Sequence, residues 1–276
     1  MFRTVLVYVD TLSGSEARIR LAVDLARQFD ASVIGLAAGV PRLPIEVYDA
    51  ALGTVAIGPD YTEFDRRHVE AEFGKAAATF KKVTDGSGIE TDWRAVFEAP
   101  SVAIVRAATA ADIVVLGPGD NSLLGELTIA APGDVVLQTG RPVLFAPAGK
   151  DRLDVRTVLV AWKDTPEAQR AIADAIPFMK RAAVVTVACV QEGKEVPPEL
   201  ADATGFLLRH GITARTEVIK AGGRTVGEGL LEFARRSQTD LIVAGAYGHS
   251  RLREWAFGGV TRGLLVDSHI PVLFSH

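Results

Sequence analysis

Glycines flank the part of the sequence best suited to hold a ligand. They follow an apolar run at 241–244 and recur before a helix-like run at 260–266. Glycine lets backbone N–H groups approach an anion, and a helix N-terminus adds unpaired donors and a favourable dipole. The two elements together predict a phosphate cradle, although ordinary turn and helix-cap chemistry would also explain the glycines. The candidate binding residues are Gly245, Gly248, His249, Ser250, Gly258, Gly259, Val260 and Thr261.

Two cationic or titratable side chains could add to this cradle. Lys163 follows the strand-like run 157–161 and could meet a phosphate directly, or simply be solvated at a strand end. His249 could contact a phosphate or move a proton, but it has no neighbouring base or nucleophile. The chain contains neither the Walker A pattern nor the G-x-G-x-x-G dinucleotide fingerprint. No catalytic set or metal-ligand spacing is identifiable, so we do not expect an enzyme or a bound metal.

The elements that position these residues come from a duplication. Segment 3–7 recurs as 156–160, segment 111–117 as 239–245, and segment 142–145 as 271–274, in the same order. Matching positions lie 153 residues apart at the first pair and 128 apart at the second. The first copy is therefore about 25 residues longer, and the excess is placed at 41–65, as a surface loop or a lid.

Each copy alternates strands and helices. Strand-like runs at 5–9, 31–38, 91–96, 113–116 and 143–145 are separated by helix-like segments, and the second copy repeats the plan. We expect Ser13 with Glu16 to form a capping box, and Thr165 with Pro166 to start the corresponding helix. The alternation predicts two α/β domains, 1–147 and 155–276, joined by a polar linker. In such sheets a ligand binds beyond the carboxyl ends of the strands.

The spacing Gly245-x2-Gly248-x9-Gly258 resembles the G-x2-G-x9-G-[ST] nucleotide motif of the universal stress protein family. The flanking runs 157–161, 223–234 and 270–274 resemble other parts of the same domain. The resemblance implies two tandem Rossmann-like, adenine nucleotide α-hydrolase-like domains, each with a mostly parallel five-stranded sheet between helices. It also implies pairing through the last strand, and binding of ATP or AMP in some members, with or without Mg²⁺.

The second copy departs from that motif at two positions. Where ATP-binding members end their first strand with a carboxylate, this copy carries Lys163, whereas the first copy carries Asp10. Gly259 replaces the hydroxyl residue after the third glycine, and Thr261 lies two places later. The backbone donors of the cradle are independent of these side chains, but the side-chain contacts to the base and the phosphate are not.

The first copy departs further. Gly117 is retained, but Asp120 stands where the second glycine is expected and Asp134 stands near the later part of the cradle. A carboxylate there repels a phosphate by about 1 kcal/mol or more at close range. Pro118 also removes one backbone donor. We therefore expect no ATP binding in this half, whose role would be structural, with a different ligand beneath the 41–65 insert left open.

The composition argues against a membrane-spanning, a secreted or a nucleic-acid-binding protein. The 276 residues are 48% hydrophobic and 23% charged, with a formal net charge of −4 and one cysteine. No run is long enough to span a bilayer and no signal peptide precedes the first strand, so a soluble, cytoplasmic protein is expected. The acidic balance gives no reason to bind nucleic acid or a membrane surface. A homodimer or an internal pseudo-dimer is expected, and the sequence names no partner protein.

These observations converge on a stress-response protein that binds ATP or AMP in its C-terminal domain. A pseudo-dimeric scaffold that binds no nucleotide is the first alternative, and the residues Lys163, Gly259 and Asp120 favour it. A weak ATP hydrolase is the second alternative, which would require a metal ion and a positioned water.

Overall fold

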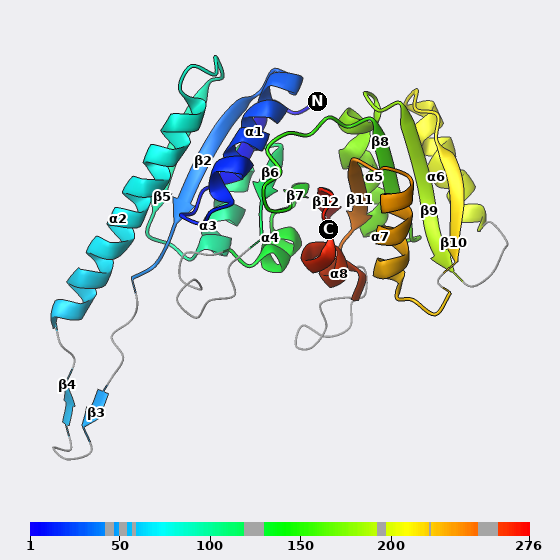
Figure 1. The fold of residues 1–276 in the computed structure, drawn as a ribbon. Helices are drawn as coiled ribbons and strands as arrows, with labels where there is room; N and C mark the ends of the chain where they lie inside the picture. Colours follow the sequence, from blue (N-terminus) through cyan, green and yellow to red (C-terminus); the bar gives the residue numbers. More distant parts are fainter. Residues whose placement is uncertain are drawn as a thin grey trace.

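One continuous sheet of ten strands runs through the molecule (Figure 1). This computed structural model describes residues 1–41, 47–49, 54–56, 59–118, 130–191, 197–220, 222–247 and 259–276. The strand order is β10-β9-β8-β11-β12-β7-β6-β1-β2-β5. The strands of the first half are β1 (Thr4–Tyr8), β2 (Ser32–Ala38), β5 (Thr91–Val96), β6 (Ile113–Leu116) and β7 (Val143–Phe145). Those of the second half are β8 (Thr157–Ala161), β9 (Val184–Gln191), β10 (Arg215–Lys220), β11 (Leu241–Gly245) and β12 (Val272–Ser275).

The two halves join through their last strands. Within each half all neighbouring strands are parallel, whereas β7 and β12 pair antiparallel, with Leu144 opposite Leu273. The predicted α/β class, with a mostly parallel five-stranded sheet in each half, is confirmed. The pairing expected between the last strands of two domains takes place within this one chain.

Helices cover both faces of the sheet, and consecutive residues of the central strands are therefore buried. One apolar cluster contains Val5 and Val7 with α1, α2, α5 and α6, and the other contains Leu6 and Tyr8 with α3, α4, α7 and α8. The helices of the first face are α1 (Ser15–Phe29), α2 (Pro59–Thr84), α5 (Pro166–Met179) and α6 (Pro198–Arg209). Those of the other face are α3 (Pro100–Ala107), α4 (Pro132–Gln138), α7 (Val226–Arg236) and α8 (Gly259–Asp267), with a 3-10 turn at Ala108–Ala110.

The predicted helix starts were right in one half and wrong in the other. Thr165 caps α5, accepting from the Ala168 N–H at 3.4 Å. The capping box of Ser13 and Glu16 does not form: α1 starts at Ser15 after Gly14, with no side-chain cap. The Glu16 carboxylate is instead bound by side chains of Arg20 and Lys82.

The segment predicted as an insert contains a small antiparallel pair of strands. β3 (Val47–Asp49) pairs with β4 (Thr54–Ala56), and Figure 1 shows this pair extending away from the ten-stranded sheet. The following helix, α2, begins at Pro59, inside the segment 41–65 that was predicted as the insert.

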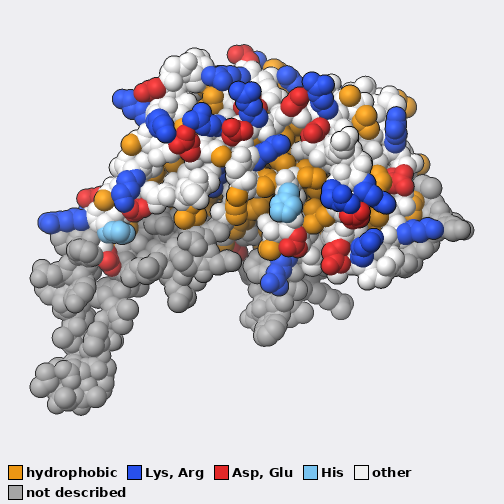
Figure 2. Space-filling view, viewed as in Figure 1, with side chains coloured by type: hydrophobic (Ala, Val, Ile, Leu, Met, Phe, Trp, Pro, Cys, Tyr) orange, Lys and Arg blue, Asp and Glu red, His pale blue; other side chains and the backbone are white. Residues whose placement is uncertain are grey.

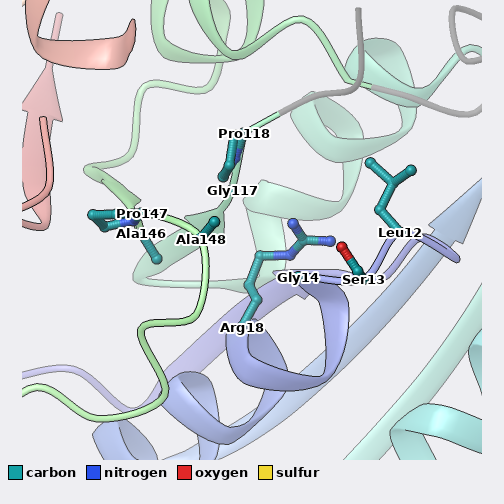
Figure 3. A pocket seen from close by; sticks show the side chains of 9 residues that line it. All are labelled: Leu12, Ser13, Gly14, Arg18, Gly117, Pro118, Ala146, Pro147 and Ala148. Atoms are coloured by element: carbon teal, nitrogen blue, oxygen red, sulfur yellow. The ribbon is translucent and has the colours of Figure 1, made fainter. Parts of the chain in front are cut away.

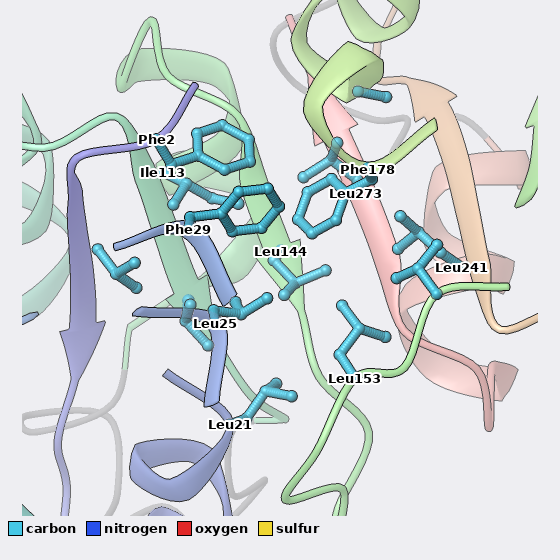
Figure 4. Close-up of a cluster of buried hydrophobic side chains, with 14 of the residues drawn as sticks. Phe2, Leu21, Leu25, Phe29, Ile113, Leu144, Leu153, Phe178, Leu241 and Leu273 are labelled. Carbon is cyan, nitrogen blue, oxygen red and sulfur yellow. The ribbon is translucent and has the colours of Figure 1, made fainter. Parts of the chain in front are cut away.

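Aromatic side chains from both halves meet above β7 and β12 (Figure 4). The rings of Phe2 and Phe29 in the first half lie 5.3 and 5.4 Å from that of Phe178 in α5. Leu153 of the linker is fully buried in the same cluster, and its carbonyl accepts from the Gln28 side chain at 2.8 Å. The linker thus contributes Leu153 to the core, whereas its residues 148–152 and 154 are exposed.

No described helix combines the length and apolarity that crossing a membrane requires. On the face shown in Figure 2, charged side chains of both signs are interspersed.

The aromatic contact predicts that the halves unfold together. Phe178→Ala should lower the free energy of unfolding by about 3–5 kcal/mol, because the ring is 1% exposed and packs on both halves. Urea unfolding followed by circular dichroism measures the loss, and hydrogen exchange should show lower protection in α1 as well as in α5. Leu208→Ala, at a side chain 64% exposed on α6, is the control and should change stability by less than about 0.5 kcal/mol. Unchanged protection in α1 would contradict the account.

Candidate functional site

The carboxyl ends of the central strands carry the predicted site of the second half. Gly245 is the last residue of β11, which pairs with β8, and exposed Lys163 lies two residues beyond the end of β8. Gly259 is the first residue of α8 and is exposed. The predicted residues Gly248, His249, Ser250 and Gly258 lie outside the described residues.

At the start of α8, backbone groups are exposed to a ligand, whereas the side chains are absent or at least half-buried. A Cβ at Gly259 would meet open space, so ligand atoms could approach its backbone closely. Val260 is half-buried, and Thr261 is only 4% exposed, so the threonine side chain packs into the protein. The first-turn N–H groups of the helix are therefore the donors available here.

The packing of β11 against α5 requires glycine at position 245, independently of any ligand. A Cβ at this position would lie 2.5 Å from the Ala168 nitrogen and 2.7 Å from the Glu167 carbonyl carbon, both in the first turn of α5. Backbone atoms this close leave room for glycine only. The presence of glycine at this position of the motif therefore has a structural cause in addition to any role in binding.

The turn after β11 lies near the first half of the chain. Tyr247 adopts a φ of +60°, and burial raises the pKa of its phenol to about 12. The carboxylate of Asp134, in the first turn of α4, adds to that rise in pKa. The predicted anion-repelling carboxylate of the first half thus also acts on the second half.

The corresponding site in the first half holds a buried ion pair that the sequence analysis missed. Arg18 Nη2 lies 2.6 Å from the Oδ2 atom of Asp10, and both side chains are buried. The Arg18 Nε donates to the Tyr8 carbonyl at 2.8 Å, and the Leu12 N–H donates to Asp10 Oδ1 at 3.1 Å. The strand-end carboxylate, which the family resemblance assigns to nucleoside binding, is occupied by a side chain of its own domain.

Alignment of the two repeats could have indicated this ion pair from the sequence. Arg18 interrupts an apolar helical stripe, and the matching position in the second half is Ala171, which is buried. Where one repeat has a buried alanine and the other has an arginine, the arginine also faces the core. A buried charge needs a polar partner, which here follows the neighbouring strand.

A pocket of about 250 Å³ adjoins the ion pair (Figure 3). It lies where the start of α1 faces the ends of β6 and β7. The Arg18 guanidinium lies against Gly117, where an added Cβ would be 2.5 Å from its Nη1. The lining residues are Leu12, Ser13, Gly14, Arg18, Gly117, Pro118, Ala146, Pro147 and Ala148.

Comparison with known proteins identifies relatives of the same architecture. The sequence profile of the Universal stress protein family matches residues 1–146 and again 154–276. Universal stress protein Slr1230 of Synechocystis sp. is 23% identical over 172 residues, which are 59% of this chain and 57% of that protein. This match therefore spans less than two thirds of the relative's length.

Two solved structures have the same fold over almost the whole chain. A universal stress protein from Archaeoglobus fulgidus DSM 4304 aligns with a TM-score of 0.68 at 16% identity, covering 99% of this chain and 97% of its own. A putative universal stress protein from Pseudomonas aeruginosa UCBPP-PA14 aligns with a TM-score of 0.57 at 14% identity, covering 99% and 93%.

The two motif glycines should respond differently to the same substitution. Gly245→Ala should cost roughly 1–3 kcal/mol of stability, because the new Cβ collides with backbone of α5. Gly117→Ala should cost less, because the atom it meets is the end of the Arg18 side chain. Thermal and urea unfolding of both variants test this order. An equal or reversed order would show that α5 does not pack against β11 in this way.

Proposed function

Because the chain belongs to the universal stress protein family in both of its halves, we propose that it is a stress-response protein that binds ATP or AMP through its C-terminal half. The proposal assigns nucleotide binding to the second half alone. The first half contributes the other side of the shared sheet, and the charge of Asp134 adds to the rise in the pKa of Tyr247.

The observation that carries the proposal is the position of Gly245 and Gly259. Gly245 is the last residue of β11, and Gly259 is the first residue of the nine-residue helix α8. A strand end followed by a helix N-terminus is the arrangement that holds phosphates in open α/β sheets. Leu264 of α8 lies in the same apolar cluster as Ala244 and Ala246, at the end of β11.

Lys163 places a positive charge where a strand-end carboxylate such as Asp10 would place a negative one. Lys163 is exposed and lies two residues beyond the end of β8, the strand that pairs with β11, and an ammonium attracts phosphate oxygens. The next residue, Asp164, is engaged by the Gln169 side chain at 3.4 Å. We therefore propose that this half recognises the phosphates more strongly than the ribose, so that ATP binds more tightly than AMP.

A scaffold that binds no nucleotide is the second candidate. The close contact of α5 with Gly245 favours it, because this glycine has a structural reason to be present. The internal use of Asp10 by Arg18 favours it in the first half.

Titration calorimetry of the full chain with ATP and AMP, with and without Mg²⁺, tests the proposal. One site per chain of micromolar affinity is expected, with ATP the tighter ligand. Gly248→Asp should weaken ATP binding by about tenfold or more, because it places a carboxylate in the phosphate motif. Gly74→Asp, at an exposed position of α2 with open space around it, is the matched control and should bind as the unmodified chain does.

Three results would overturn this assignment. Absence of binding, with no nucleotide retained through purification, would favour the scaffold. Two sites per chain would show that the first half binds as well. Full affinity in the Gly248→Asp variant would place the nucleotide elsewhere.

A further inference from the structure

The pocket in the first half is not part of the proposed nucleotide site, which belongs to the second half. It lies between the start of α1 and the ends of β6 and β7, in the half that departs from the nucleotide motif. At about 250 Å³ it is smaller than the 300–1,000 Å³ typical of drug-sized ligand sites. It is therefore suited to a small molecule and not to a nucleoside triphosphate.

At one end of this pocket lies the Arg18 guanidinium, and only some of its N–H groups donate hydrogen bonds within the described residues. Arg18 is 4% exposed; its Nε donates to the Tyr8 carbonyl, and its Nη2 donates to Asp10 and, at 3.4 Å, to Ser15 Oγ. Among the described residues, none accepts a hydrogen bond from Nη1, which lies against Gly117 on the pocket wall. A guanidinium has five N–H donors, so two remain for a ligand here. Figure 3 shows the guanidinium reaching towards Ser13 from the body of α1.

The start of α1 borders the pocket through Ser13 and Gly14, and it supplies further donors next to that wall. Its N-cap is Gly14, which has no side chain to satisfy the first-turn N–H groups. The Ser15 N–H is taken by the Leu12 carbonyl and the Arg18 N–H by the Gly14 carbonyl. No described residue accepts from the N–H groups of Glu16 and Ala17, which lie between them. A helix N-terminus of this kind favours an anion.

The nearby carboxylates are already engaged. Asp10 accepts from Arg18 and from the Leu12 N–H. Glu16 is held by Arg20 at 2.6 Å and by Lys82 at 3.0 Å. An incoming anion would therefore meet donors whose nearest negative neighbours are paired.

Apart from the Ser13 hydroxyl, the side chains of the rest of the pocket wall are apolar. Leu12, Pro118 and the segment 146–148 carry no ionisable side chain. We propose that the first half binds a small organic oxyanion, whose phosphate or carboxylate group meets Arg18 Nη1 and the N-terminus of α1. Its apolar body lies against Leu12, Pro118 and Pro147.

Titration of the full chain with phenyl phosphate, benzoate and phenol tests this site. Phenyl phosphate and benzoate present the same ring with either anionic group, and phenol keeps the ring without an anionic group at neutral pH. Binding of one or both oxyanions at one site per chain, with phenol bound about tenfold more weakly or not at all, is expected. Comparison of the two oxyanions identifies the preferred anionic group.

Two variants locate the binding. Arg18→Met combined with Asp10→Asn removes the guanidinium without leaving a buried carboxylate unpaired, and should weaken oxyanion binding by about tenfold. Ala148→Phe, at an exposed lining position, should block the pocket without disturbing the core, and decides the matter if the double variant does not fold. Arg20→Met, on the same helix but not lining the pocket, is the matched control and should bind normally.

The inference is overturned if neither oxyanion binds at about 10 mM, a limit that corresponds to very weak affinity. It is also overturned if phenol binds as well as the oxyanions, or if the folded variants bind as the unmodified chain does. The Gly248→Asp variant should retain oxyanion binding, so failure of the nucleotide proposal is distinguishable from failure of this one.

Discussion

The antiparallel pairing of β7 with β12 is the constraint on which the rest of the structure depends. β7 is only three residues long, and its side chains are almost completely buried. In an isolated half it would be an exposed apolar edge, which proteins avoid because such edges aggregate. Pairing with β12 removes that edge, and the cluster of Phe2, Phe29 and Phe178 covers the junction on one face.

This shared frame allows the two strand-end sites to diverge. One half must keep the sheet and the helix packing, but it need not keep the ligand chemistry of the other. The first half places Arg18 against Asp10 and forms a small pocket beside the uncapped start of α1. The second half has Ala171 and Lys163 at the matching positions, and the first turn of α5 lies directly against Gly245. The matching strand ends of the two halves thus differ in charge and in packing.

The fold was predictable from the sequence because its signals are local and repeated. Apolar runs such as 113–116 coincide with strands, and Thr165 with Pro166 marks the start of α5. The errors arose where contacts between elements decide the outcome. Glu16 is held by Arg20 and by Lys82 of α2, and it does not cap α1. The pocket beside Arg18 depends on the approach of α1 to β6, which spacing along the chain does not encode. Asp10, the partner of Arg18, lies only eight residues away and could have been found from the register of the repeat.

A crystal structure of the full chain grown with ATP tests the central claim, that the two halves have divided their binding roles, most directly. The account predicts nucleotide density between the end of β11 and the start of α8, with the phosphates near Lys163. It also predicts that Arg18 remains paired with Asp10 and that no nucleotide lies beside them. Nucleotide bound in the first half, with that ion pair broken, would contradict the account.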